Sequence, residues 1–142
     1  MRFRRSASLA AATFAALAAG ATVRAQTPPK ACASAATQSE MTECADKAFR
    51  KADQELNDSY KTIEARLKGD AEKMNRLVTA QRAWIVFRDA ECNFAASNVA
   101  GGSAYPMTVA LCAEAMTNHR LQDLKAYLKC EEGDMSCPVP AK

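Results

Sequence analysis

Residues 74–95 read MNRLVTAQRAWIVFRDAECNFA, and apolar side chains recur in them along two helical stripes. The first stripe consists of Leu77, Ala80, Trp84, Phe87 and Phe94, and the second of Met74, Val78, Ile85, Cys92 and Ala95. A helix with two apolar stripes can pack against two neighbours. The pattern therefore predicts the middle helix of a three-helix bundle.

The segment before it predicts a first helix. Thr37-Gln38-Ser39-Glu40 has the form of a capping box, in which the two outer side chains satisfy N–H groups of the first turn. Apolar or small residues then recur every three or four positions, at Met41, Ala45, Ala48, Ala52, Leu56, Tyr60, Ile63 and Leu67. Gly69 predicts the end of this helix, and Asp70 predicts the N-cap of the middle one.

The segment after it predicts a third helix. Residues 98–106, NVAGGSAYP, break the helical pattern, and we expect Ser103 to cap a helix whose first turn holds Pro106. Its stripe consists of Met107, Leu111, Glu114, Thr117, Leu121, Leu124 and Leu128, and it ends near Cys130. Helices of similar length with short connections favour antiparallel neighbours. The predicted fold class is all-α, a three-helix antiparallel bundle stapled by disulfides.

The composition agrees with a single small domain. Of the 142 residues, 49% are hydrophobic and 25% are charged, which is the balance of a soluble globular protein. His119 is the only histidine, so histidine-dependent catalysis would rest on one residue, and the pattern around it predicts a solvated side chain. We predict no catalytic residues, no metal site and no cofactor.

The first 25 residues have the form of a secretory signal peptide. Three arginines among the first five residues precede an Ala-rich apolar segment, and Val23-Arg24-Ala25 fits a cleavage site after Ala25. An uncleaved membrane anchor is disfavoured, because the apolar segment is too short to span a bilayer. The predicted organisation is a signal peptide over 1–25, an extended lead-in over 26–36, a helical domain over 37–130 and a tail over 131–142.

Cleavage would change the charge of the chain. It removes four of the 19 basic residues and none of the 16 acidic ones, which leaves a net charge of about −1 and argues against a nucleic-acid partner. The residues before Cys32 do not form a lipid-attachment motif. We therefore expect a periplasmic or secreted protein with no stable membrane anchor.

Six cysteines follow the predicted cleavage point. An even number in a short exported chain indicates disulfides, and the absence of a C-x-x-C pair disfavours a metal centre. Antiparallel packing brings the end of the middle helix beside the start of the third, and the lead-in and the tail each lie next to a helix end. The pairs that need no chain crossing are Cys32–Cys44, Cys92–Cys112 and Cys130–Cys137.

Several polar residues fall on the helical stripes, and buried polar groups need partners. They are Gln81, Arg88, Asp89, Glu114 and Arg120. We expect an Arg88–Glu114 or an Arg120–Asp89 pair across the bundle, in a hydrogen-bond network that fixes helix register. A ligand-binding pocket is the alternative. Asp53 and Asn57 could be read as half of a carboxylate acid–base pair, but a polar edge bonded to a neighbouring helix is the favoured interpretation.

The ordered set of motifs resembles the LprI-like family of small exported bacterial proteins. The motifs are Cys32, Ala36 to Met41, Cys44, Ala52-Asp53, Leu56-Asn57, Tyr60, Ala80 to Trp84, Phe87 to Cys92, Gly101 to Ser103, Cys112, Thr117 and Arg120. The resemblance spans about residues 32–130. It implies an all-helical, disulfide-bonded envelope domain and the activity that names the family, inhibition of lysozyme.

The glycine-rich connection is the candidate contact with a partner, because it is polar and ends in an aromatic residue. Its candidate binding residues are Asn98, Gly101, Gly102, Ser103 and Tyr105, and the Cys92–Cys112 bond would staple it. An ordinary helix–helix connection, whose glycines satisfy backbone geometry, is the favoured interpretation of this segment taken alone. The acidic tail at 131–134 offers a second way to attract a basic lysozyme.

The function predicted from the sequence is an exported, non-enzymatic binding protein that inhibits lysozyme. The alternative is a structural or stress-related envelope protein that meets another envelope protein through a helical face. An enzyme is disfavoured, because the sequence contains no catalytic motif.

Overall fold

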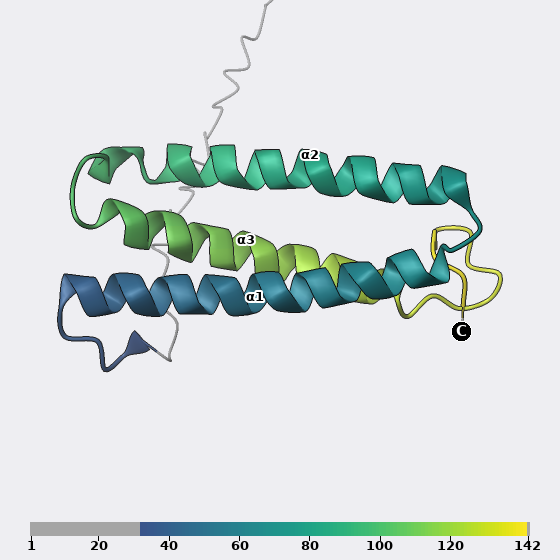
Figure 1. The fold of residues 1–142 in the computed structure, drawn as a ribbon, viewed down its shortest axis with the longest axis horizontal. Helices are drawn as coiled ribbons and strands as arrows, with labels where there is room; N and C mark the ends of the chain where they lie inside the picture. The colour runs from purple at the N-terminus through teal and green to yellow at the C-terminus, as the bar shows by residue number, and fades with distance from the viewer. Residues whose placement is uncertain (1–31, 142) are drawn as a thin grey trace, which may run out of the picture.

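A computed structural model describes residues 32–141, and the predicted signal peptide lies outside the described residues. Three long helices, α1 (Gln38–Arg66), α2 (Ala71–Ala95) and α3 (Tyr105–Tyr127), follow one another, and a short 3₁₀ turn, η2 (Ser97–Val99), comes after α2. Consecutive helices run antiparallel, so α1 and α3 run parallel and side by side (Figure 1). The described residues contain no strand, and the all-α prediction is confirmed.

The capping box predicted for the first helix is present in α1. The backbone N–H groups of Ala36 and Thr37 donate to Oε2 of Glu40 at 2.8 and 3.0 Å, and the Glu40 N–H donates to Oγ1 of Thr37 at 3.2 Å. Hydrogen bonds to the carboxylate from the Ala36 N–H, then from the Thr37 N–H and the Thr37 side chain, lower the pKa of the Glu40 carboxyl. The ionised carboxylate is therefore the form that holds the start of α1.

Glu40→Gln tests this cap through its pH dependence. Because the folded-state pKa of Glu40 is lowered, the ionised carboxylate stabilises the fold above the unfolded-state pKa, and this contribution is lost as the pH falls through the folded-state value. We expect wild type to melt above the variant at pH 7 and the gap to be smaller at pH 3. Thermal melts at both values measure it. Glu132→Gln, in the exposed tail, is the control; an equal gap at both pH values would contradict the charge-based cap.

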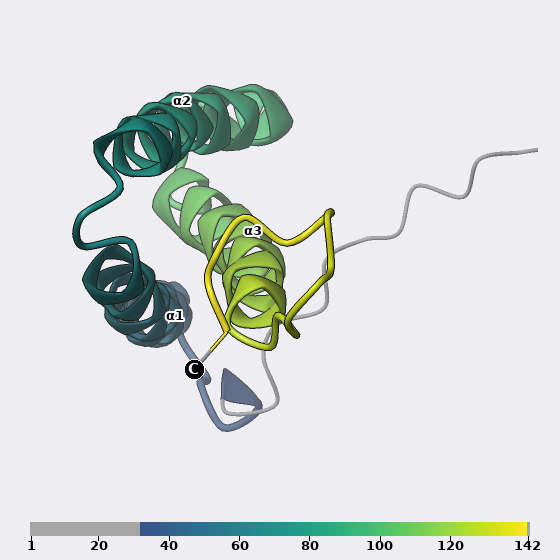
Figure 2. The same cartoon turned by 90° about the vertical axis from the view of Figure 1, so that its right-hand side faces the viewer.

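The hydrophobic core lies mainly between α1 and α3, and α2 packs against α3 (Figure 2). Its buried members are Leu56, Ile63, Leu67, Leu121, Leu124 and Val139. Val139 belongs to the tail, which folds back over the end of the bundle and leaves this side chain 3% exposed. The sequence does not predict this burial, because a lone apolar residue among prolines carries no helical or strand period.

Disulfides staple the fold at three places. Cys32–Cys44 folds the lead-in back onto α1, and Cys92–Cys112 joins the end of α2 to the start of α3; these two predicted pairs are confirmed. A third bond joins Cys130 to Cys137 and closes the tail. Each bond removes conformational freedom from the unfolded chain, so the staples stabilise a domain whose core is small.

Two expectations about the middle and third helices are wrong. The buried residues of α2 are Gln81, Arg88 and Cys92, so its inner face lies between the two predicted stripes, and Phe87 and Phe94 point to solvent. The reason is that α2 packs mainly against α3, which covers only one side of it. Ser103 does not cap α3: the N-cap is Ala104, and Pro106 occupies the first turn.

Candidate functional site

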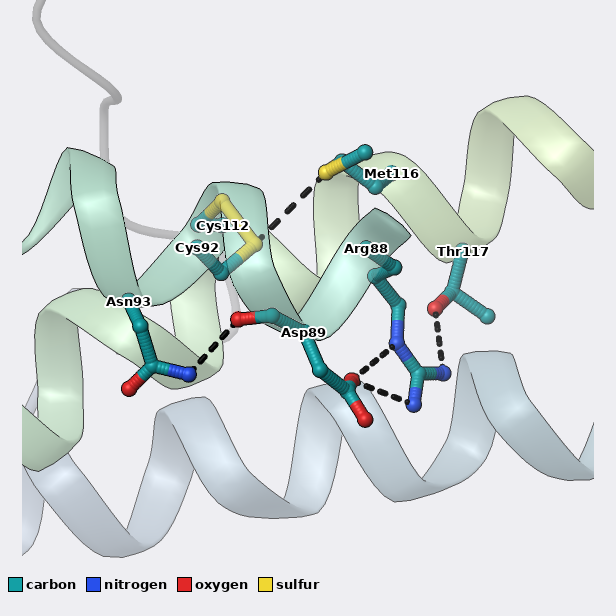
Figure 3. Close-up of a disulfide and its surroundings, with 7 residues drawn as sticks. All are labelled: Arg88, Asp89, Cys92, Asn93, Cys112, Met116 and Thr117. Atoms are coloured by element: carbon teal, nitrogen blue, oxygen red, sulfur yellow. Dashed lines mark hydrogen bonds and ion pairs between the residues drawn. A yellow bond between two sulfur atoms is a disulfide. The ribbon is translucent and has the colours of Figure 1, made fainter. Parts of the chain in front are cut away.

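Arg88 is the centre of the polar interior. Its guanidinium donates from Nε to Oδ1 of Asp89 at 2.9 Å, and from Nη1 to Oδ1 of Asp53 at 3.3 Å and to Oγ1 of Thr117 at 3.5 Å (Figure 3 draws the Asp89 and Thr117 contacts). Asp53 lies on α1, Asp89 on α2 and Thr117 on α3. One buried side chain of α2 therefore connects all three helices.

Two aromatic rings complete the surroundings of this guanidinium. Its central carbon lies 5.1 Å from the ring centroid of Phe49 and 5.1 Å from that of Trp84. The flat, delocalised guanidinium stacks on such rings while its edge donates hydrogen bonds, which an ammonium group does poorly. The arrangement of Arg88 with Phe49, Asp53, Trp84, Asp89 and Thr117, called the arginine cluster below, is therefore specific for arginine.

The other predicted network residues lie apart from this cluster. Arg120 donates from Nε to Oε1 of Gln81 at 3.3 Å, and its Nη1 lies 3.7 Å from Oδ2 of Asp123. Glu114 accepts a hydrogen bond from Asn118, one turn along α3. The expected Arg88–Glu114 and Arg120–Asp89 pairs do not form, because each arginine finds a closer acceptor.

The buried polar atoms of the arginine cluster form hydrogen bonds with side chains of the protein itself. Among the described residues, every buried side-chain nitrogen or oxygen has a hydrogen-bond partner. Asp53 accepts from both Arg88 and Asn57, the latter at 3.0 Å. This arrangement agrees with the interpretation of Asp53 and Asn57 as a polar edge, and the cluster favours a structural role over a ligand pocket.

The glycine-rich connection protrudes at one end of the bundle, beside the start of α1 (Figure 1). Residues 98–105 are called the stapled loop here, because the Cys92–Cys112 bond closes its base. Asn98, Gly101, Gly102 and Ser103 are exposed. Tyr105 is half-buried, and its hydroxyl donates to Oδ1 of Asn93 on α2, so this ring braces the loop from inside.

The stapled loop and the acidic tail lie at opposite ends of the molecule (Figure 1). The 23 residues of α3 separate them, which corresponds to roughly 35 Å at the rise of an α-helix. One small globular partner docked at the loop would therefore not reach the tail. The two partner-binding predictions describe two different sites.

Membrane spans and metal sites are both absent from residues 32–141. None of the helices in this range combines the length and the apolar composition of a membrane span. The same range contains no group of three or more His, Cys, Asp or Glu side chains placed to hold a metal ion.

Fold and site together define a class of protein: a small, disulfide-stapled three-helix domain whose interior is tied together by its own arginine cluster. A family model described as lysozyme inhibitor LprI matches residues 30–124. The chain belongs to this family, and the resemblance noted in the sequence is confirmed. The match covers the arginine cluster, two of the disulfides and the stapled loop.

One relative among curated proteins extends the comparison. The chain is 36% identical over 123 residues to an uncharacterized protein of Rhizobium meliloti (strain 1021), and the alignment covers 79% of this chain and 88% of the relative. No solved structure matches the chain significantly.

Proposed function

We propose that this protein is an exported, non-enzymatic inhibitor of lysozyme that acts in the periplasm or outside the cell. The observation that carries the proposal is the match of the lysozyme inhibitor LprI family over residues 30–124. The signal-like N-terminus and the disulfides support an oxidising, extracytoplasmic location, because such bonds persist there.

The stapled loop is the surface that we assign to lysozyme. A loop that enters an enzyme cleft must be exposed, narrow and ordered before binding, because ordering it on binding weakens the complex. Asn98, Gly102 and Ser103 are exposed at the loop surface, and the Cys92–Cys112 bond fixes its base. Gly101 has a φ of 78°, a conformation that glycine adopts without strain.

The chemistry of the loop suits carboxylates. Residues 97–105 contain no charged side chain, so recognition would rest on hydrogen bonds from the Asn98 amide and the Ser103 hydroxyl. Glycoside hydrolysis uses two carboxyl groups in the cleft, and both are acceptors for such donors. The loop would block the cleft with neutral donors and would add no charge beside these groups.

A lysis assay tests the proposed function. The oxidised protein, starting at residue 26, is titrated against lysozyme acting on bacterial cell walls, and we expect saturable inhibition at near-stoichiometric ratios. An unchanged lysis rate at a tenfold molar excess over chicken-type, goose-type and invertebrate-type lysozymes would contradict the proposal.

Asn98→Ala/Ser103→Ala tests the loop assignment. Loss of two hydrogen bonds at a desolvated contact is expected to weaken inhibition about tenfold or more, since each bond contributes about 1 kcal/mol. Inhibition curves measure the change. Asn75→Ala, an exposed substitution at the other end of α2, is the matched control and should inhibit like wild type. If the loop variant inhibits lysozyme as strongly as the Asn75→Ala control does, the loop is not the binding surface.

The second candidate is a structural envelope protein that acts through a helical face. It is favoured by the apolar outer surface of α2, where Val86, Phe87 and Phe94 are exposed. Failure of the lysis assay would leave this candidate as the leading function.

A further inference from the structure

The outer surface of α2 is unusually apolar for a solvent-facing helix. Phe87 is 57% exposed, Phe94 74% and Val86 69%. In both views α2 lies on the outside of the bundle, with α1 and α3 on one side of it only (Figures 1 and 2). Exposed aromatic side chains gathered on one helix face indicate a contact surface.

The exposed residues on this face follow a heptad spacing. Steps of four and three residues connect Arg76, Ala80, Ala83, Phe87, Ala90 and Phe94, and all six are exposed. This set is called the outer seam. Alternating steps of four and three place residues on the line along which two helices pack in a coiled coil. The seam faces away from Arg88, so another helix could cover it without disturbing the arginine cluster.

We propose that the outer seam binds a second copy of this chain, with the two α2 helices antiparallel. The order of side-chain sizes supports this orientation. Ala80 and Ala83 follow Arg76 in the first half of the seam, and Phe87 and Phe94 lie in the second half with Ala90 between them. Antiparallel pairing places Phe87 of one copy against Ala80 and Ala83 of the other, whereas parallel pairing stacks the large residues on each other and the small ones on each other. Large residues placed opposite small ones fill the space between two helices best.

The charges near the two ends of the seam select the same orientation. Arg76 lies at one end and Glu91 near the other. Glu91 has no ion-pair partner among residues 32–141, and Arg76 pairs only with Glu72 of its own helix, with its side chain 76% exposed. An antiparallel arrangement centred between Ala83 and Trp84 brings each Arg76 to the Glu91 of the other copy. A parallel arrangement would bring Arg76 to Arg76 and Glu91 to Glu91, which is repulsive.

Sedimentation equilibrium of the oxidised protein, from residue 26, tests the dimer. Between about 1 and 200 μM we expect the mass to rise from one copy to two. Phe87→Glu should weaken association at least tenfold, because it would bury charges in the seam. Gln54→Glu, an added charge on the exposed face of α1, is the control and should dimerise like wild type. Circular dichroism and a melt check that both variants are folded. A wild-type mass of one copy throughout would overturn the proposal.

Charge reversal tests the orientation separately. Arg76→Glu and Glu91→Arg should each weaken the dimer several-fold, and the double variant should recover wild-type association. Absence of recovery would overturn the antiparallel arrangement. Lysozyme inhibition by Phe87→Glu gives an independent readout: we expect it to be unchanged, because the seam is not the stapled loop. Loss of inhibition together with a monomeric wild type would assign the seam to lysozyme instead of a second copy.

Discussion

Arg88→Ala is expected to lower the free energy of unfolding by about 2–4 kcal/mol, somewhat less than breaking a fully buried ion pair costs. The Arg88 side chain is 9% exposed, but those of Asp53 and Asp89 are 40% and 57% exposed. Water can therefore solvate both carboxylates when the arginine is removed, which places the expected loss below the largest values for buried pairs. Lost stacking on Phe49 and Trp84 adds to it. Urea unfolding followed by circular dichroism measures the change.

Two further variants separate the specific role of Arg88 from loss of a charge. Arg82→Ala removes an exposed arginine six residues earlier on the same helix, and we expect a change within about 0.5 kcal/mol. Arg88→Lys keeps the charge but loses the planar fork and the stacking, so it should recover less than half of the lost stability. Full recovery by lysine would mean that charge alone holds the three helices together.

The helices were predictable because their signals are local. The Thr37–Glu40 capping box, the Asp70 cap and the apolar periods act within a few residues, and the structure contains helices where they predict them. The first two disulfides followed from helix order. The failed Ser103 cap has a local cause as well: with Pro106 in the first turn of α3, one fewer N–H requires a cap.

The orientation of α2 was not predictable from its stripes. Apolar residues of α2 are spread around most of its circumference, so its sequence is compatible with several inward faces. In the structure, the inward face of α2 carries the polar residues Gln81 and Arg88. It faces inward because the partners of these residues lie on the neighbouring helices: Asp53 on α1, and Thr117 and Arg120 on α3. Such partners are 29 to 39 residues away in sequence, and residue spacing along one helix carries no information about them.

The same limit applies to the ion pairs of the interior. Arg88 was expected to reach Glu114, yet its partners include its sequence neighbour Asp89. The register of α2 against α3 decides which acceptor an arginine meets, and the Cys92–Cys112 bond fixes that register one turn from Arg88 (Figure 3). The disulfide and the arginine cluster therefore hold the same helix pair. Removing one of them should show how well the other holds α2 on its own.

Cys92→Ala/Cys112→Ala is expected to lower the free energy of unfolding by about 3 kcal/mol, from the chain entropy of a 20-residue separation. Lost packing adds to this value, because the two cysteines are 1% and 4% exposed. Since α2 packs mainly on α3, the bond also anchors the end of α2. Cleavage within residues 93–105 by a protease should therefore accelerate under native conditions. Urea unfolding and mapped proteolysis measure the two effects.

Cys130→Ala/Cys137→Ala is the matched control for this prediction. Its separation is 7 residues, so the same entropy argument gives a smaller loss of about 2 kcal/mol, and cleavage should increase in the tail and not in the stapled loop. If both double variants lost equal stability and the loop stayed resistant, the arginine cluster alone would be sufficient to hold α2. In that case Arg88→Ala, and not the cysteine variant, should release the end of α2 and expose the loop to cleavage.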